Sequence, residues 1–210
     1  DEVCQEAARQ EIIRRVLITE CDYKKGKVPA EVLERVQLIM KEVGVKLEDR
    51  TCVNVAREYA EDKRNLDDRY ENVVVMAMEL PDGTIITGRS SRRMVAAGAV
   101  VLNAIKHIAG MADEVLLIAP DVFHAIQMMK TEVLDQEKTS LTLEDVLSAL
   151  AISALTNEEA KRAADKLPEL MGAKAHCTAI LNDKDEQALK AMGVDVTSDP
   201  EYITTNLYFN

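Results

Sequence analysis

Apolar side chains recur at helical spacing through the first third of the chain. One set falls at i, i+4, i+7 and i+11 and so shares a helix face: Val32, Val36, Ile39 and Val43. Pro29 suits the first turn of this helix, and Gly44 suits its carboxyl end. A helix before it is expected to end at Gly26, and a third helix to run over about 52–62. The charged stretch 61–71 then predicts a solvated link.

Two runs rich in β-branched residues flank the turn signal Pro81-Asp82-Gly83, which predicts a β-hairpin. The second strand is expected to stop at Gly88. A helix should begin within the pair Ser90-Ser91 and continue to about residue 109. The continuously apolar segment Val115–Ala119 is typical of a short buried strand.

The remaining sequence alternates helix and strand. Pro120 opens a helix, and capping-box patterns at Thr142 and Thr156 open two more. The expected elements that follow are a strand at 175–181, a helix at 183–192 and a last strand at 194–197. These patterns predict an α/β fold: a mixed sheet of about five strands flanked by helices, after a mostly helical N-terminal region. The predicted domains are 1–66 and 67–210, the second with a helical insertion at about 138–170.

Charge and composition exclude several classes of protein. The 210 residues hold 26 Lys and Arg against 37 Asp and Glu, a net charge of −11. A chain this acidic argues against a general nucleic-acid or anionic-membrane binder. No apolar run reaches the roughly 18 residues of a membrane helix, and no signal peptide is visible. We therefore expect a cytoplasmic protein without nucleic-acid or membrane partners.

The cysteines predict no metal site. Cys4, Cys21, Cys52 and Cys177 form no CxxC pair, and no Cys/His spacing matches a zinc site. Each is expected to be a reduced, buried thiol.

Five segments carry a family resemblance: 87–91, 102–110, 130–134, 166–170 and 175–181. They resemble the C-terminal half of a bacterial family, the domain-of-unknown-function family numbered 1846. The resemblance covers essentially the whole chain and implies a missing N-terminal half that is nucleotide-binding-like and carries a Gly-rich phosphate loop. It implies no cofactor within this chain, and leaves a nucleotide as a candidate ligand of the full-length protein. The expected partners are that missing half and, in a homo-oligomer, further copies. Arg89 and Cys177 depart from the family pattern, and the family supplies no catalytic residues.

A second resemblance is architectural. The expected order of hairpin, helix, buried strand and helix is similar to the cytidine-deaminase-like core. The zinc ligands of that core are absent, since the helix reads Ala97-Gly98-Ala99 and the strand is followed by Pro120-Asp121-Val122-Phe123-His124.

One group of residues predicts an anion site: Gly88, Arg89, Ser90, Ser91 and Arg92. A helix that starts near Ser90 would present free N–H groups and its positive dipole end to a ligand, and arginine adds charge-assisted hydrogen bonds. The alternative is that a serine only caps the helix while the arginines lie in solvent.

Two further groups contain histidine. Asn103 and His107 lie one turn apart on a helix face, either in a site or on an ordinary surface. His176 and Thr178 share one face of a strand and Cys177 takes the other, so adjacent His and Cys cannot pair as base and nucleophile. His176 and Thr178 are candidates to line a cleft, and Cys177 is expected in the core.

Three functions remain open. The chain is a ligand-binding or assembly domain that serves the nucleotide-binding-like half, with an anion site near Ser90. Alternatively it is half of a composite active site with His107 or His176 as acid or base, since histidine titrates near neutral pH. The third alternative is a structural dimerisation module. Convergence of His107, His176 and the Ser90 helix start in one cleft would favour a site.

Overall fold

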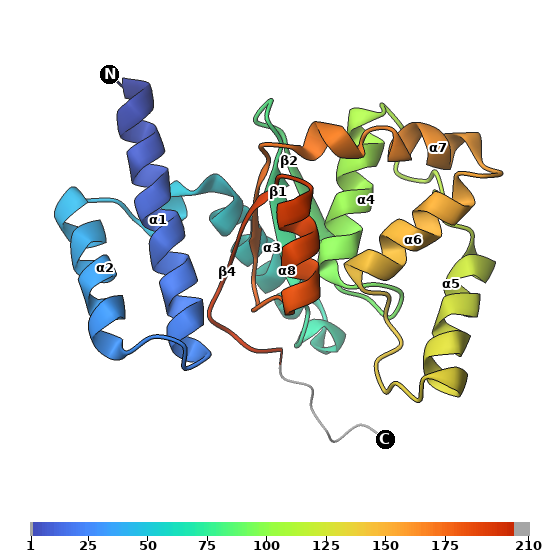
Figure 1. The fold of residues 1–210 in the computed structure, drawn as a ribbon, viewed down its shortest axis with the longest axis horizontal. Helices are drawn as coiled ribbons and strands as arrows, with labels where there is room; N and C mark the ends of the chain where they lie inside the picture. Colours follow the sequence, from blue (N-terminus) through green and yellow to red (C-terminus); the bar gives the residue numbers. More distant parts are fainter. Residues whose placement is uncertain (1, 204–210) are drawn as a thin grey trace.

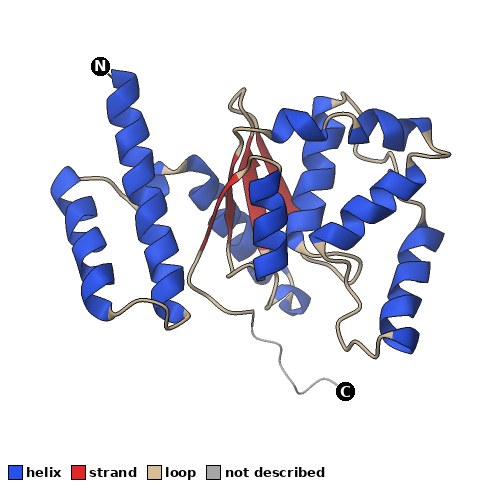
Figure 2. Ribbon diagram, viewed as in Figure 1, coloured by secondary structure: helices blue, strands red, loops and turns tan. Residues whose placement is uncertain are grey.

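A small central sheet divides the molecule into two helical layers (Figures 1 and 2). The structure is a computed structural model and describes residues 2–203. Within that range the α-helices are α1 (Glu2–Lys24), α2 (Ala30–Val43), α3 (Thr51–Leu66), α4 (Ala96–Ile108), α5 (Pro120–Met128), α6 (Leu143–Ser153), α7 (Glu158–Ala164) and α8 (Asp183–Ala191). The strands are β1 (Val75–Glu79), β2 (Ile85–Arg89), β3 (Lys174–Cys177) and β4 (Asp195–Ser198). The α/β class predicted from the sequence is confirmed.

The N-terminal helices follow the sequence pattern closely. α1 ends just before Gly26, and α2 is closed by Gly44 in the left-handed conformation with φ 75°. α3 is longer than predicted and runs on to Leu66, so the expected solvated link is partly helical. Its buried residues Cys52, Ala56 and Ala60 pack on β1, and the turns beyond Ala60 carry no buried residue, so the charged stretch is solvated as expected although it is helical.

The sheet is mixed, with the order β2-β1-β3-β4 among the described residues. β1 pairs antiparallel with both β2 and β3, while β3 pairs parallel with β4 across the α8 connection. The hairpin and the parallel pairing of the strand near residue 175 are confirmed. The described part of the chain forms four strands, so the expected count of about five is one too many.

The missing strand is the segment Val115–Ala119, which is irregular instead, with a bend at residues 117 and 118. Leu117 and Ile118 are buried as its apolar pattern requires. Within the segment, however, the Leu116 carbonyl accepts a hydrogen bond from the Asn157 side chain at 3.3 Å, and just before it the Asp113 carbonyl accepts from Lys106. The Asn157 side chain thus engages an acceptor that a strand would use for a ladder. The element order that resembled a cytidine-deaminase-like core therefore lacks its middle strand.

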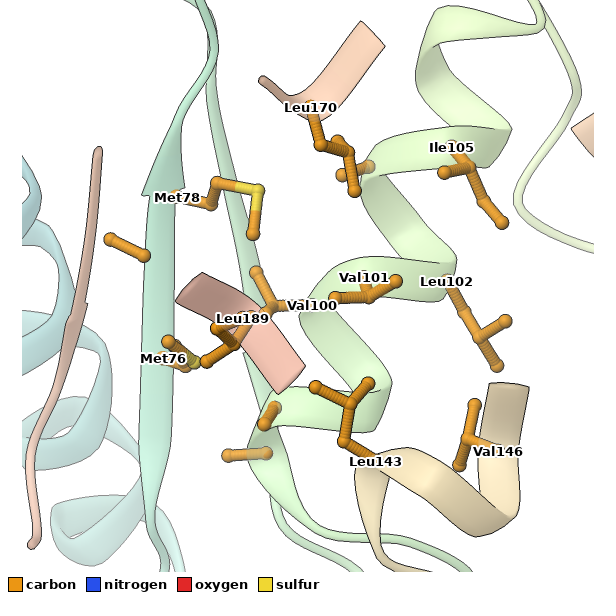
Figure 3. Close-up of a cluster of buried hydrophobic side chains, with 14 of the residues drawn as sticks. Met76, Met78, Val100, Val101, Leu102, Ile105, Leu143, Val146, Leu170 and Leu189 are labelled. Atoms are coloured by element: carbon orange, nitrogen blue, oxygen red, sulfur yellow. The ribbon is translucent and has the colours of Figure 1, made fainter. Parts of the chain in front are cut away.

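The main core lies between the sheet and α4, α6 and α8 (Figure 3). Met76 and Met78 of β1 face Val100 and Leu189 across it. On the opposite face, alternate β1 residues Val75 and Ala77 meet α3. Because both faces are covered, β1 is the most buried strand and its side chains are almost all apolar.

The starts of α6 and α7 follow the predicted caps with a shift of one residue at α7. Thr142 forms the expected capping box with Asp145, whereas α7 is capped by Asn157 and not by Thr156. Three cysteines are buried as expected, but Cys4 is exposed, since the start of α1 extends beyond the rest of the protein (Figure 1). Over residues 2–203, no helix is both long and apolar enough to cross a bilayer.

Candidate functional site

Three hollows adjoin at one end of the sheet. β2, β3 and β4 end there and β1 begins there, because β1 runs antiparallel to its neighbours. The first hollow, of about 550 Å³, is lined by residues that include Arg57, Thr178 and Asp199. The second, of about 970 Å³, contains Arg89 in its wall. Asn72 lines both of these and also the third, of about 300 Å³.

Basic side chains gather around these hollows although the chain as a whole is acidic. Six basic and six acidic residues line them: Arg57, Arg64, Arg69, Arg89, Arg92, Lys138, Glu61, Asp68, Glu71, Asp185, Asp199 and Glu201. The net charge of the residues that line the hollows is therefore zero, whereas the net charge of the whole chain is −11. The second hollow is the most basic, with three arginines and two carboxylates.

The helix that was expected to start at Ser90 starts at Ala96. A short parallel bridge between Met94 and Leu141 holds the preceding residues extended. Val95 N–H donates to the Leu141 carbonyl at 3.0 Å, and Leu141 N–H donates to the Arg93 carbonyl at 2.8 Å. Because of this pairing with a distant loop, the helix starts about one and a half turns later in the chain than expected. The predicted position of the helix start was therefore wrong.

Both serines are engaged with the local backbone. Ser90 Oγ accepts from Val74 N–H at 3.0 Å and thereby prolongs the β1–β2 pairing. Ser91 Oγ accepts from the N–H groups of Arg93 and Met94 in a turn. Neither serine caps α4, whose N-cap residue is Val95.

The arginines remain available to a ligand. The Arg89 guanidinium lies over the Tyr70 ring, 5.0 Å from its centre. The side chain of Arg92 is exposed, and its carbonyl accepts from Gln127. Both residues line the second hollow.

Other predicted site residues have structural partners. Thr178 Oγ1 accepts from Val75 N–H at 3.0 Å and extends the β1–β3 ladder. Asn103 donates to the Thr87 carbonyl at 2.9 Å and ties α4 to β2. Gly88 lies directly beneath α4, where a Cβ atom would come within 2.2 Å of the Val100 nitrogen. Gly88 is thus required by packing.

The two candidate histidines do not meet. His107 is exposed near the hairpin turn, close enough to Asp82 to affect its pKa. Ser90 lies beyond the opposite end of β2, whose five residues span roughly 15 Å. His176 is buried on the α3 side of the sheet, whereas α4 covers the other face. The convergence that would favour a site built on both histidines is absent from residues 2–203.

His176 belongs to a buried polar cluster on β3 and β4. Its Nδ1 lies 2.9 Å from Thr197 Oγ1, directly across the parallel strand pair. Its Nε2 lies 3.2 Å from Asp199 Oδ1, but the geometry does not meet that of a hydrogen bond. This contact is therefore electrostatic. Arg57 completes the cluster with a two-pronged hydrogen bond to Asp199, at 2.6 and 3.2 Å.

This cluster shifts the protonation of its members. Burial lowers the pKa of His176 and outweighs the nearby Asp199 carboxylate, so the imidazole is neutral at pH 7. Burial acts to raise the pKa of Asp199, but His176 and Arg57 outweigh it and lower that pKa to about 2. Burial also raises the pKa of Cys177 to about 12, which makes it an inert core thiol as expected.

Replacing His176 with Gln is expected to flatten the pH dependence of stability below neutral pH. The folded pKa of His176 is depressed, so the unfolded chain binds its proton first, near pH 6.5. The stability that neutral His176 contributes is present above that pH and is lost as pH falls toward the folded pKa. Urea unfolding between pH 7.5 and 5 should show a steeper loss for the natural chain than for His176→Gln.

The matched control is His107→Gln, which alters an exposed imidazole and should keep the natural pH profile. Glu20 and Asp185 have raised pKa values and oppose the trend equally in all three proteins. Identical slopes for the natural chain and His176→Gln would contradict the assignment.

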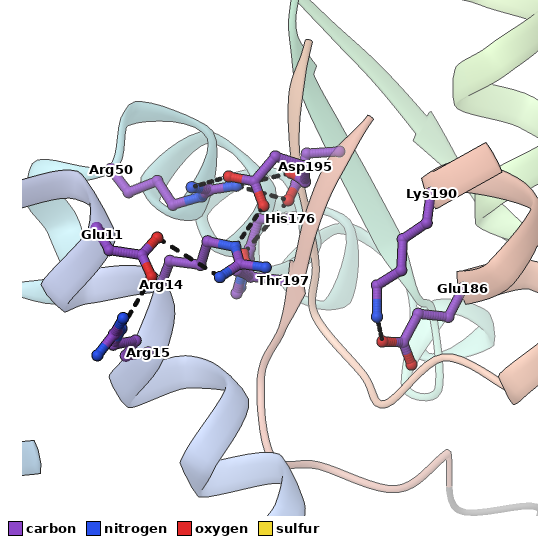
Figure 4. A network of polar contacts seen from close by, with 10 residues as sticks. Glu11, Arg14, Arg15, Arg50, His176, Glu186, Lys190, Asp195 and Thr197 are labelled. Carbon is purple, nitrogen blue, oxygen red and sulfur yellow. Dashed lines mark hydrogen bonds and ion pairs between the residues drawn. The ribbon is translucent and has the colours of Figure 1, made fainter. Parts of the chain in front are cut away.

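Sequence reasoning missed a second polar cluster beside the first (Figure 4). Arg50 is 1% exposed and donates to Asp195 Oδ2 at 3.1 Å, while Arg14 donates to Asp195 Oδ1 at 2.7 Å. The signal lay in the strand 194–198, where aspartate and threonine alternate with valine. That alternation marks a polar strand face, which faces α1 and α3 in the folded protein.

Within residues 2–203, no group of three or more His, Cys, Asp or Glu side chains is arranged to hold a metal ion.

Comparison with known proteins places the chain in a family. Residues 48–208 match the sequence profile described as domain of unknown function DUF1846, C-terminal. The chain belongs to the DUF1846 family. Residues 1–44 match the N-terminal profile of the same family, so the prediction that the chain corresponds to the C-terminal half is only partly right. α1 and α2 fall in the N-terminal profile, and the sheet falls in the C-terminal one.

Relatives in the DUF1846 family are bacterial. The chain is 49% identical over 210 residues to a UPF0371 protein of Clostridium botulinum strain Langeland. It is 45% identical over the same length to one of Clostridioides difficile strain 630. Each alignment covers 100% of this chain and 42% of the relative. The chain thus spans less than half the length of these DUF1846 relatives.

Proposed function

We propose that this chain is a ligand-binding domain that takes a phosphate-bearing anion where the second and third hollows meet. The ligand would lie against the first turn of α4, with Arg89, Arg92 and Lys138 around it. Ser90 and Ser91 line both hollows and would form the floor between them.

The observation that carries this proposal is that the N-terminus of α4 has unpaired backbone N–H groups. Ala96 and Ala97 line the third hollow, and their N–H groups make no hydrogen bond to any residue in the described part of the chain. The first N–H groups of a helix have no partner within it, and both alanines are at least 97% buried. A buried N–H group without a partner costs about 1–3 kcal/mol. An anion would satisfy both donors and the positive helix end.

The location of the site supports a two-part protein. Ligands of α/β proteins bind beyond the carboxyl ends of parallel strands, and β3 and β4 both end here. In the longer relatives, a nucleotide-binding-like half would close over this sheet end and share the ligand. A nucleotide is then a natural candidate, since its phosphates match the arginines and the helix end.

The expected result is that inorganic pyrophosphate or ATP binds this chain, measured by isothermal titration calorimetry at low salt. Replacing Arg89 and Arg92 with Ala should weaken binding at least tenfold, because each removes a charge-assisted hydrogen bond of about 1.5–3 kcal/mol. The melting temperature should change little, since the Arg89–Tyr70 contact contributes about 0.5–1 kcal/mol.

Arg35→Ala is the matched control, because Arg35 is an exposed arginine on α2 and lines none of the three hollows. It should bind as the natural chain does. Absence of binding by both probes, or equal binding by the Arg89/Arg92 variant, would contradict the proposed site.

A further inference from the structure

α2 carries an apolar stripe that nothing in the described part of the chain covers. Among the described elements α2 packs mainly on α1, and it stands at the outer edge of the molecule (Figure 1). Its contact with α1 uses Leu33 and Met40, which are half-buried. Val32, Ile39 and Val43 lie beside that contact and are 41%, 42% and 43% exposed. Residues at i, i+7 and i+11 fall on one helix face, so these three form one stripe.

The stripe is unusual for a helix of this kind. A surface helix normally turns its apolar face to the core and its charged face to water. α2 instead has no buried residue among its described positions and leaves three β-branched side chains in solvent. Contiguous exposed apolar surface of this sort marks a contact with another polypeptide.

The family comparison identifies the occupant. α1 and α2 are the elements of this chain that match the N-terminal DUF1846 profile, which covers residues 1–44. The relatives match this chain over only 42% of their length, so they carry more polypeptide than the two helices. A domain whose profile includes α2 would pack its other elements on the free face of that helix.

We propose that the stripe Val32–Ile39–Val43 is the docking surface for the rest of the N-terminal DUF1846 domain. This inference rests on the two-part arrangement proposed above, but it does not depend on the anion site, which lies at the sheet end. Burying three half-exposed aliphatic side chains supplies the apolar centre of an interface. The charged residues of α2 would then form its rim: Glu31, Glu34, Arg35, Lys41 and Glu42.

The test is co-expression of this chain, tagged, with the untagged remainder of the Clostridium botulinum relative that lies outside the matched region. A soluble one-to-one complex should copurify, as measured by light scattering after size exclusion. Replacing Val32 and Ile39 with Asp should reduce complex recovery at least tenfold. The variant should keep the melting temperature of the natural chain, because neither side chain is buried.

Leu155→Asp is the matched control. Leu155 is 82% exposed at the end of α6, remote in the chain from α2, and its replacement should leave the complex intact. Failure to obtain any soluble complex would overturn the proposal. So would a dimer of this chain alone that dissociates in the Val32/Ile39 variant, because a second copy would then occupy the stripe. Pyrophosphate titration of the same variant separates the two ideas, since docking can fail while anion binding persists.

Discussion

Replacing Gly88 with Ala is expected to lower the free energy of unfolding by about 3 kcal/mol, at the upper end of the range for overpacking. A Cβ atom there would lie 2.2 Å from the Val100 nitrogen and 2.6 Å from its Cα. These are backbone atoms of α4, so the helix itself must move away from β2. Urea unfolding at pH 7, followed by circular dichroism, measures the loss.

Gly98→Ala is the matched control, because Gly98 lies on α4, the helix that packs on Gly88. Its Cβ would meet the Val146 side chain, with Cγ2 at 2.8 Å, and that side chain can adjust more readily than a backbone. Alanine also favours the helical state by about 1 kcal/mol relative to glycine. The two effects should nearly cancel. A Gly88→Ala protein as stable as the Gly98→Ala protein would show that α4 is not tightly seated on β2.

Replacing Asp195 with Ala is expected to cost about 3 kcal/mol of unfolding free energy. The change removes the carboxylate partner of Arg50, whose side chain is 1% exposed and is left with the carbonyl groups of Ala175 and of residue 195 itself. The Asp195 side chain is 36% exposed, but its removal is costly because the buried charge of Arg50 stays out of water without its partner. Arg14 also loses Asp195, but it keeps Glu11 at 3.5 Å, and it is partly exposed so that water can solvate it.

The double variant Arg50→Met with Asp195→Ala tests the cause. Methionine fills similar space without a charge, so the double variant should be more stable than Asp195→Ala alone by about 1 kcal/mol or more. Equal stability of the single and double variants would mean that the stranded charge is not the source of the loss. The measurement is the same urea unfolding, with the natural chain as reference.

Predictions about the position of site residues agree with the structure where they rest on local features of the chain, and they were wrong where a distant segment takes part. Arg89 and Arg92 line a hollow because their position at and just after the end of β2 is a local feature of the chain. The expected cap at Ser90 was wrong because Met94 pairs with Leu141, almost fifty positions away. Residue types and spacing reveal the groups that carry charge. They do not reveal which of those groups a distant segment will engage.

The sequence by itself determined the helices of the first third, the hairpin at Pro81-Asp82-Gly83, the acidic character and the family resemblance. Each of these depends on periodicity, turn chemistry or motifs that are local to the chain. Only the tertiary structure decided that Val115–Ala119 is not a strand and that α4 begins at Ala96. It also decided that one face of β3 and β4 is a buried polar layer. These outcomes depend on which backbone and side-chain groups satisfy one another across long separations, and that competition is settled only when the elements pack.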